Sequence, residues 1–172
     1  KAVLKQSRDS YMNLEEFLKD NFKAFSQITK FVEDNQSNFE QLDETLSVQA
    51  DELITYLKQD QQPWDKFPQF KKLYKELHQA IKDRLNTLRS DVVAKYEAIF
   101  KEVDEHRKKL NIDTPNLTAD PQYYLNLIGK ENHISKLEIY DLQAHDFKAK
   151  CFKILEDHKA KEEAKEKCGD YV

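Results

Sequence analysis

The hydrophobic pattern between Phe67 and Leu110 predicts one very long α-helix. Apolar residues recur there at steps of three and four, which places them on one helical face, and no proline or glycine follows Pro68. The recurring positions are Phe70, Leu73, Leu77, Ile81, Leu85, Leu88, Val92, Tyr96, Ile99 and Val103. At about 1.5 Å per residue such a helix is roughly 65 Å long. That length is typical of a strut, a coiled-coil arm or the spine of an elongated bundle, and such a helix rarely lines a catalytic pocket.

Four shorter segments repeat the same spacing and predict further helices. With the long helix at about 68–110, their approximate ranges are 13–35, 39–59, 120–128 and 134–167. Asn13 and Asp120 can cap two of these helices, Pro121 suits a first helical turn, and Gly129 is typical of a helix end. The first two segments together match the long helix in length, and the last could run back along it. These features predict an all-α, elongated, antiparallel bundle, coiled-coil-like, with one very long central helix.

The composition agrees with long helices joined by few loops. The 172 residues include only 2 glycines and 4 prolines, whereas average usage is about 7% and 5%. Charged residues make up 35% and hydrophobic residues 39%, which is enough for one apolar face on each helix. The 10 phenylalanines and 8 tyrosines argue against a disordered polyelectrolyte. We therefore expect a single soluble helical module spanning residues 1–172.

The termini and cysteines bear on the protein's context. The sequence lacks the run of about 18 apolar residues that a membrane span needs, and it shows no signal-peptide pattern. It starts at Lys1, without Met, in residues that already favour a helix, so we expect a piece of a longer polypeptide. Cys151 lies on an apolar face and Cys168 in a polar tail, too far apart along one helix to bond each other. A reduced, cytoplasmic protein fits best, with the role of Cys168 open.

A search for catalytic and metal-binding motifs returns none. Di-iron bundles need Glu-x-x-His pairs, and the pattern is absent at all five histidines: His78, His106, His133, His145 and His158. Zinc-type Cys and His clusters are also absent. Two glycines cannot build a phosphate-binding loop. The carboxylates one turn before His106 and His145, Glu102 and Asp141, are best explained as solvated pairs. We expect no catalytic residue, cofactor or metal here.

The charge distribution leaves two interpretations open. Residues 13–60 hold eleven acids and four lysines, whereas residues 66–89 hold seven basic residues against Glu76 and Asp83. The basic start of the long helix could pair with the acidic segment before it, which is the interpretation we favour because the whole chain carries a net charge of −4. Alternatively, it could contact nucleic-acid phosphates. The candidate nucleic-acid contacts are Lys71, Lys72, Lys75 and Lys82.

Aromatic residues gather at the two predicted loops. Trp64, Phe67 and Phe70 cluster where the long helix begins, and Tyr123 and Tyr124 follow the second loop. Aromatic residues in such places more often close a core. A contiguous exposed patch would instead be a partner surface, so these five residues are the candidate partner surface.

Three stretches of the sequence resemble helical segments of the large P-loop ATPase of BREX phage-defence systems. They are Phe31-Val-Glu-Asp-Asn-x-x-Asn-Phe39, then Leu57-Lys-Gln-Asp-Gln-Gln-Pro63-Trp, then Phe67-Pro-Gln-Phe-Lys-Lys-Leu73 opening a long Lys/Glu helix. The resemblance covers under half of the chain. It implies an accessory helical region of a multidomain bacterial ATPase that acts beside a methyltransferase in phage restriction. The nucleotide motifs of such a parent would lie elsewhere.

Two function hypotheses of different classes follow. The first is a non-catalytic scaffold or protein-interaction module of a larger cytoplasmic protein, possibly that defence ATPase, with a protein partner or neighbouring domains of its own chain. The second is a nucleic-acid-contacting arm that uses the basic start of the long helix. An enzyme whose site escapes every motif is the weakest interpretation, because it would need a deep polar pocket between helices.

Overall fold

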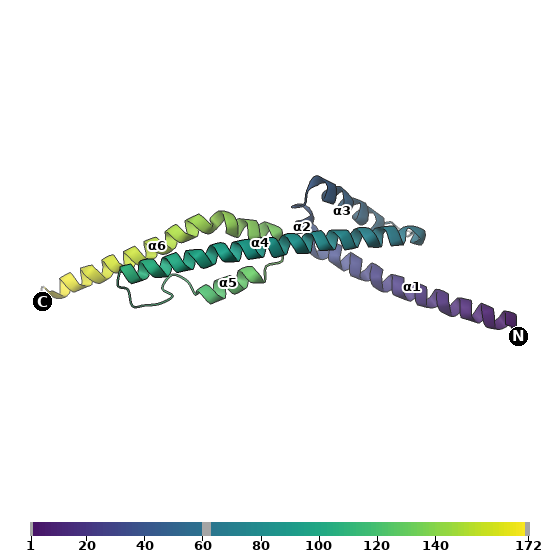
Figure 1. Ribbon diagram of the computed structural model, residues 1–172, viewed down its shortest axis with the longest axis horizontal. Coiled ribbons are helices and arrows are strands. Elements are labelled where there is room, and N and C mark those ends of the chain that lie inside the picture. Colours follow the sequence, from purple (N-terminus) through teal and green to yellow (C-terminus); the bar gives the residue numbers. More distant parts are fainter. Residues whose placement is uncertain (1, 60–62, 171–172) are drawn as a thin grey trace. The chain divides into compact units, whose positions relative to one another are not determined.

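Helices are the only regular secondary structure over the described residues, as the sequence predicts. The structure is a computed structural model that describes the backbone of residues 2–59 and 63–170 and the side chains of residues 15–59 and 63–168 (Figure 1). No β-strand occurs within these ranges. The helices are α1 (Ala2–Asp34), α2 (Gln36–Phe39), α3 (Glu44–Leu57), a 3-10 turn η1 (Trp64–Lys66), α4 (Phe67–Lys109), α5 (Pro121–Gly129) and α6 (Ile134–Asp170).

Local signals account for most helix boundaries. The Asp43 side chain accepts a hydrogen bond from the backbone N–H of Leu46 at 2.9 Å and caps α3. The helix predicted over 39–59 is shorter, because this cap starts α3 at Glu44, and α2 ends at Phe39 before it. The first helix, predicted over 13–35, already begins at Ala2, so Asn13 lies inside α1 and does not cap it. The Asp120 side chain caps α5 in the same way, at 3.1 Å from the N–H of Gln122. The long helix, with 43 residues, matches its predicted range within one residue at each end.

The chain forms two compact units, whereas the sequence predicts a single module. Unit 1 comprises Lys1–Ile81 and unit 2 comprises Lys82–Val172, so the boundary falls inside α4. The first fifteen residues of α4 therefore complete unit 1, and its remainder opens unit 2. Each unit is described below by itself.

Unit 1 packs α1, α3 and the start of α4 around an aromatic core. The ring of Phe25 in α1 lies 6.5 Å from Phe67 in α4, and Phe31 lies 5.0 Å from Tyr74. Because later residues of α1 meet later residues of α4, these two helices run in the same direction. The helix α3, which lies between them in the sequence, runs in the opposite direction (Figure 1). The most buried members of this core are Ile28, Ala50, Leu53, Tyr56, Phe67, Leu77 and Ile81.

Unit 2 corrects the predicted direction of the last helix. The cross-helix ion pairs of α4 with α6 advance together along both helices: Arg84–Glu138, Lys95–Asp141, Glu102–Lys148 and His106–Glu156. The last helix therefore runs parallel to α4 and not back along it. The physical reason is α5, which reverses the chain first: Tyr124 contacts Phe100, whereas the later Glu131 meets the earlier Arg89 (Figure 1).

Candidate interaction surfaces

The aromatic residues predicted as a partner surface at the start of α4 belong mainly to the core of unit 1. Phe67 is buried, so it is not available to a partner. Trp64 and Phe70 are half-buried. The Trp64 ring lies edge-on to Phe22 at 5.4 Å, and Phe70 stacks on Tyr56 at 4.0 Å. These contacts match the alternative in which the cluster closes a core.

The two tyrosines of α5, Tyr123 and Tyr124, differ in their exposure to solvent. Tyr124 lies among the rings of Tyr96, Phe100 and Phe147, at centroid distances of 5.3, 5.9 and 4.9 Å. Its burial raises the pKa of the Tyr124 phenol, and burial also raises the pKa of Tyr96, whose hydroxyl donates to the carbonyl of Tyr140 at 2.7 Å. Tyr123 is 64% exposed. Of the two, only Tyr123 is available to a partner.

An exposed apolar surface that the sequence interpretation missed lies on α1. Phe17, Leu18 and Phe22 are 55%, 37% and 57% exposed, and we call these three residues the α1 apolar surface. The spacing of Phe17 and Leu18 does not differ from that of the buried residues of α1, so the sequence pattern alone does not reveal their exposure. The length of the helix was the available signal, because a helix longer than the helices packed against it leaves part of its apolar face exposed.

The position of the α1 apolar surface follows from where α1 meets the rest of unit 1. Phe25 contacts Trp64 and Phe67, and Phe22 touches Trp64 with one edge of its ring. Every side chain from Glu15 to Asp20 is exposed. Figure 1 shows the N-terminal part of α1 leading away from α3 and α4. The surface therefore begins where the packed part of unit 1 ends.

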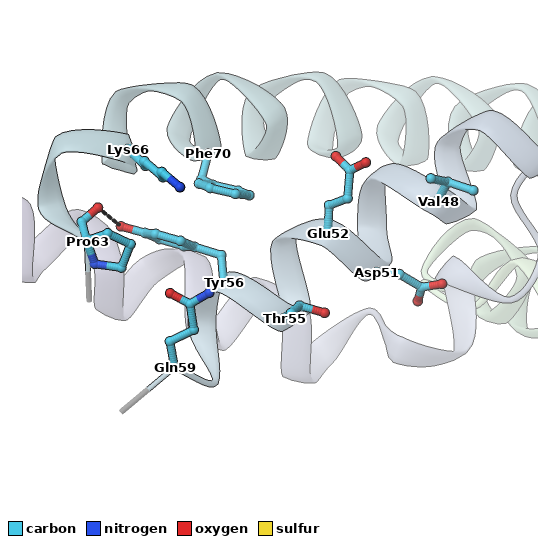
Figure 2. A pocket seen from close by; sticks show the side chains of 9 residues that line it. All are labelled: Val48, Asp51, Glu52, Thr55, Tyr56, Gln59, Pro63, Lys66 and Phe70. Atoms are coloured by element: carbon cyan, nitrogen blue, oxygen red, sulfur yellow. Dashed lines mark hydrogen bonds between the residues drawn. The ribbon is translucent and has the colours of Figure 1, made fainter. Parts of the chain in front are cut away.

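A groove of about 390 Å³ lies in unit 1 between α3, η1 and α4 (Figure 2). The hydroxyl of Tyr56 donates to the carbonyl of Pro63 at 3.4 Å across one end of this groove. Burial, and secondarily the charge of Asp65, raise the pKa of the Tyr56 phenol. The lining residues are Val48, Asp51, Glu52, Thr55, Tyr56, Gln59, Pro63, Lys66 and Phe70.

The lining of this groove combines two stacked rings with exposed charged groups. Its floor is the stacked pair of Tyr56 and Phe70, and its charged groups, Asp51, Glu52 and Lys66, are exposed. Across the residues whose side chains are described, no group of three or more His, Cys, Asp or Glu side chains could hold a metal ion. The arrangement can accept an apolar or aromatic side chain.

The four candidate lysines lie on α4 and are all exposed. Lys71, Lys75 and Lys82 share one helical face because they are four and seven residues apart, and Lys72 lies about 100° away around the helix. Within residues 15–59 and 63–168, none of the four forms an ion pair. We call these four residues the α4 lysine strip.

Among residues 15–59, the acidic part of α1–α3 forms no ion pair with the α4 lysine strip, contrary to the pairing that the favoured interpretation predicted. The two arginines of the basic region at residues 66–89 also have partners outside α1–α3. Arg84 lies 3.7 Å from Glu138, and the Nε of Arg89 donates to the carbonyl of Glu131 at 2.7 Å. Both partners belong to unit 2, so these arginines contribute to that unit's packing.

Two expected carboxylate–histidine pairs are replaced by cross-helix pairs. Glu102 pairs with Lys148, and Asp141 pairs with Lys95 at 2.8 Å, so neither holds the histidine one turn further on. Lysine competes better for a carboxylate at neutral pH because its charge is permanent there. His106 instead stacks on Phe152 at a centroid distance of 4.5 Å.

Both cysteines are free, as expected from their spacing. Cys151 is buried and Cys168 is exposed. Burial raises the pKa of the Cys151 thiol, which keeps it unreactive.

Comparisons with known proteins leave the function to be argued from these surfaces. No protein-family model, curated protein or solved structure matches the chain. Over the described residues, none of the helices combines the length and the apolar character needed to cross a bilayer.

Proposed function

We propose that this chain is a non-catalytic helical scaffold that holds a protein partner through the α1 apolar surface. The observation that carries the proposal is the exposure of Phe17, Leu18 and Phe22 within two helical turns. Scattered apolar residues are normal on protein surfaces, but a contiguous group of large ones is typical of an interface. Phenylalanine is also among the residues enriched at interfaces.

The energy available at this surface is substantial for its size. A phenylalanine side chain that becomes buried removes about 150–250 Å² from water, so the exposed half of Phe17 or Phe22 corresponds to roughly 100 Å². Covering that area is worth about 2.5 kcal/mol per ring at about 25 cal/mol per Å². Two such rings and one leucine could therefore anchor a partner.

Site-specific photo-crosslinking in the source cell tests this proposal. A photoreactive phenylalanine analogue at Phe17 or Phe22 should yield discrete crosslinked species. The same analogue at Lys23, exposed on the opposite face of α1, should not. Equal crosslinking at Lys23, or none at Phe17 and Phe22, would overturn the proposal.

A second candidate function is nucleic-acid contact by the α4 lysine strip. It is supported by four exposed lysines that hold no ion pair within residues 15–59 and 63–168. Lysines along a helix can follow a phosphate backbone, and such binding weakens steeply as salt displaces the released counterions. The net charge of −4 weighs against high affinity.

Fluorescence anisotropy with a labelled DNA duplex at low and moderate salt distinguishes the two functions. Binding that falls with salt, and is lost in Lys71→Glu/Lys75→Glu, would support nucleic-acid contact. The matched control is Lys101→Glu/Lys109→Glu, which reverses two exposed lysines elsewhere on α4. Equal loss in both double variants would show a nonspecific charge effect and remove this candidate.

We also propose, from the sequence resemblance alone, that the scaffold belongs to a phage-defence ATPase. The absence of catalytic motifs from residues 1–172 is compatible with an accessory region whose parent carries the nucleotide site. Sequencing the complete reading frame tests this point. A Gly-x4-Gly-Lys-Ser/Thr loop elsewhere in the frame would support the assignment, and a frame without any nucleotide motif would remove it.

A further inference from the structure

We infer that the groove between α3, η1 and α4 binds an extended segment of a partner protein, in which a large apolar side chain stands two positions from a lysine or arginine. This site goes beyond the proposed function, because it uses a part of unit 1 other than the α1 apolar surface. All 9 residues that line the groove have described side chains (Figure 2). Three features of the groove support the inference: its preformed apolar floor, its open shape and the charge on its α3 side.

The floor of the groove is formed before a partner binds. Phe70 stacks on Tyr56 at a centroid distance of 4.0 Å, with the two ring planes 10° apart. Tyr56 is 2% exposed, and its hydroxyl donates to the carbonyl of Pro63 at 3.4 Å, which holds the ring in place. Val48, about two helical turns before Tyr56, is 51% exposed and adds apolar surface to the lining. A large apolar side chain can therefore be buried here without the cost of first ordering the site.

The shape of the groove favours an extended chain segment. Its volume of about 390 Å³ lies near the lower end of the range of about 300–1,000 Å³ that is typical of ligand sites. Two turns of a helix about 10 Å across would fill roughly 850 Å³, so a whole helix does not fit. Most of the lining residues are exposed, including Thr55 and Gln59, so the groove is open to solvent along α3. A small molecule would remain largely in contact with water here, whereas a chain segment can place one side chain on the floor and continue past both ends.

The charge on the α3 side of the groove favours a basic residue in that segment. The helix α3 holds three acids and no basic residue, and two of these acids, Asp51 and Glu52, line the groove. Neither forms an ion pair within residues 15–59 and 63–168. Lys66 lies at the opposite end of the floor, near Pro63 (Figure 2). The two carboxylates therefore complement a cation that the bound segment supplies.

The distance between the carboxylates and the floor sets the spacing within the segment. Glu52 precedes Tyr56 by four residues, which is a rise of about 6 Å along α3. In an extended chain, side chains two residues apart point to the same side and lie about 6.6 Å apart. An apolar side chain on the floor therefore places the side chain two positions away beside Asp51 and Glu52. Lysine or arginine at that position completes the pairing.

A displayed library of random peptides, selected on the full chain, tests the chemistry of the occupant. We expect a consensus in which Leu, Phe, Tyr or Trp stands two positions from Lys or Arg. The probe for all later measurements is the synthetic peptide of that consensus sequence, and titration calorimetry gives its dissociation constant. A consensus without a basic residue at this spacing, or a selection that enriches no peptide, would overturn the inference.

Charge variants of the groove test whether the consensus peptide binds there. Asp51→Asn/Glu52→Gln should weaken binding by about threefold, and Asp51→Lys/Glu52→Lys by about tenfold or more, because the second variant replaces attraction with repulsion. A peptide with Glu in place of its basic residue should show the reverse preference and bind Asp51→Lys/Glu52→Lys more tightly than the unchanged chain.

The matched control is Glu33→Lys/Asp34→Lys, which changes the net charge equally at two exposed acids of α1 that do not line the groove. Its affinity for the consensus peptide should stay within about twofold of that of the unchanged chain, because salt screens distant exposed charges. Circular dichroism checks that every variant keeps its helix content. Equal loss in the groove variant and in this control would show nonspecific attraction and overturn the inference.

The remaining outcomes separate this groove from the α1 apolar surface. Peptide binding that is lost in Phe17→Asp/Leu18→Asp but unchanged in Asp51→Lys/Glu52→Lys would overturn the inference and support the proposed function instead. Loss confined to the groove variants supports the inference, whatever crosslinking at Phe17 shows.

Discussion

Two leucines five residues apart on α6 offer the sharpest test of the packing. Leu137 is fully buried, with 0% exposure, whereas Leu142 is 80% exposed. Replacing each with alanine removes the same three carbon atoms. At about 0.8 kcal/mol per buried CH₂ group, the transfer contribution at Leu137 is roughly 2.4 kcal/mol. The cavity left between α4 and α6 brings the expected loss of unfolding free energy to about 3–4 kcal/mol.

The control variant Leu142→Ala should change the unfolding free energy by no more than about 0.5 kcal/mol. Urea denaturation followed by circular dichroism at 222 nm measures both variants. With a slope of about 2 kcal/mol per M, the Leu137→Ala midpoint should fall by about 1.5–2 M. Equal shifts for the two variants would refute the placement of α6 against α4, because the two residues would then have similar environments.

Three further predictions concern local features. Asp43→Ala should lower the unfolding free energy by about 1 kcal/mol, and Asp43→Asn by much less, because asparagine still caps α3; thermal melts measure both. Burial raises the pKa of Tyr56, Tyr96 and Tyr124 above that of an unfolded tyrosine, so their contribution to stability is complete below about pH 10 and is lost as the pH rises further. The tyrosinate absorbance at 295 nm should therefore lag for these three residues until the helices melt. A thiol reagent at neutral pH should label Cys168 at once and Cys151 only in denaturant, and rapid labelling of both would contradict the burial of Cys151.

Local sequence patterns were sufficient to predict the helices, but not which helices pack together or in which direction they run. The limits of α4 follow from its own spacing and from Pro68, and those of α5 from Asp120 and Gly129. Whether α6 runs along or against α4 depends on α5, a helix of nine residues that reverses the chain between them. Direction is a tertiary property, and no periodicity within α6 encodes it.

The candidate surfaces show the same limit. Phe67 and Phe17 look alike in sequence, since each is an aromatic residue near other apolar residues. Phe67 is buried because α1 and α3 both reach it, whereas Phe17 is exposed because its helix continues past them. The sequence left open whether the lysines at the start of α4 are exposed or paired. That Lys71 and Lys75 form no ion pair with residues 15–59 and 63–168 depends on the rotation of α4 against its neighbours.

The contacts of Trp64 give this protein a built-in optical probe of one unit. The chain holds a single tryptophan, and its ring touches Phe22, Phe25 and Phe67, all in unit 1. Indole emission therefore reports the melting of unit 1 alone, while circular dichroism sums over both units. Coincident transitions would mean that the uninterrupted backbone of α4 couples the two units into one cooperative block, and separated transitions would mean that the helix can melt up to Ile81 while its remainder stays folded.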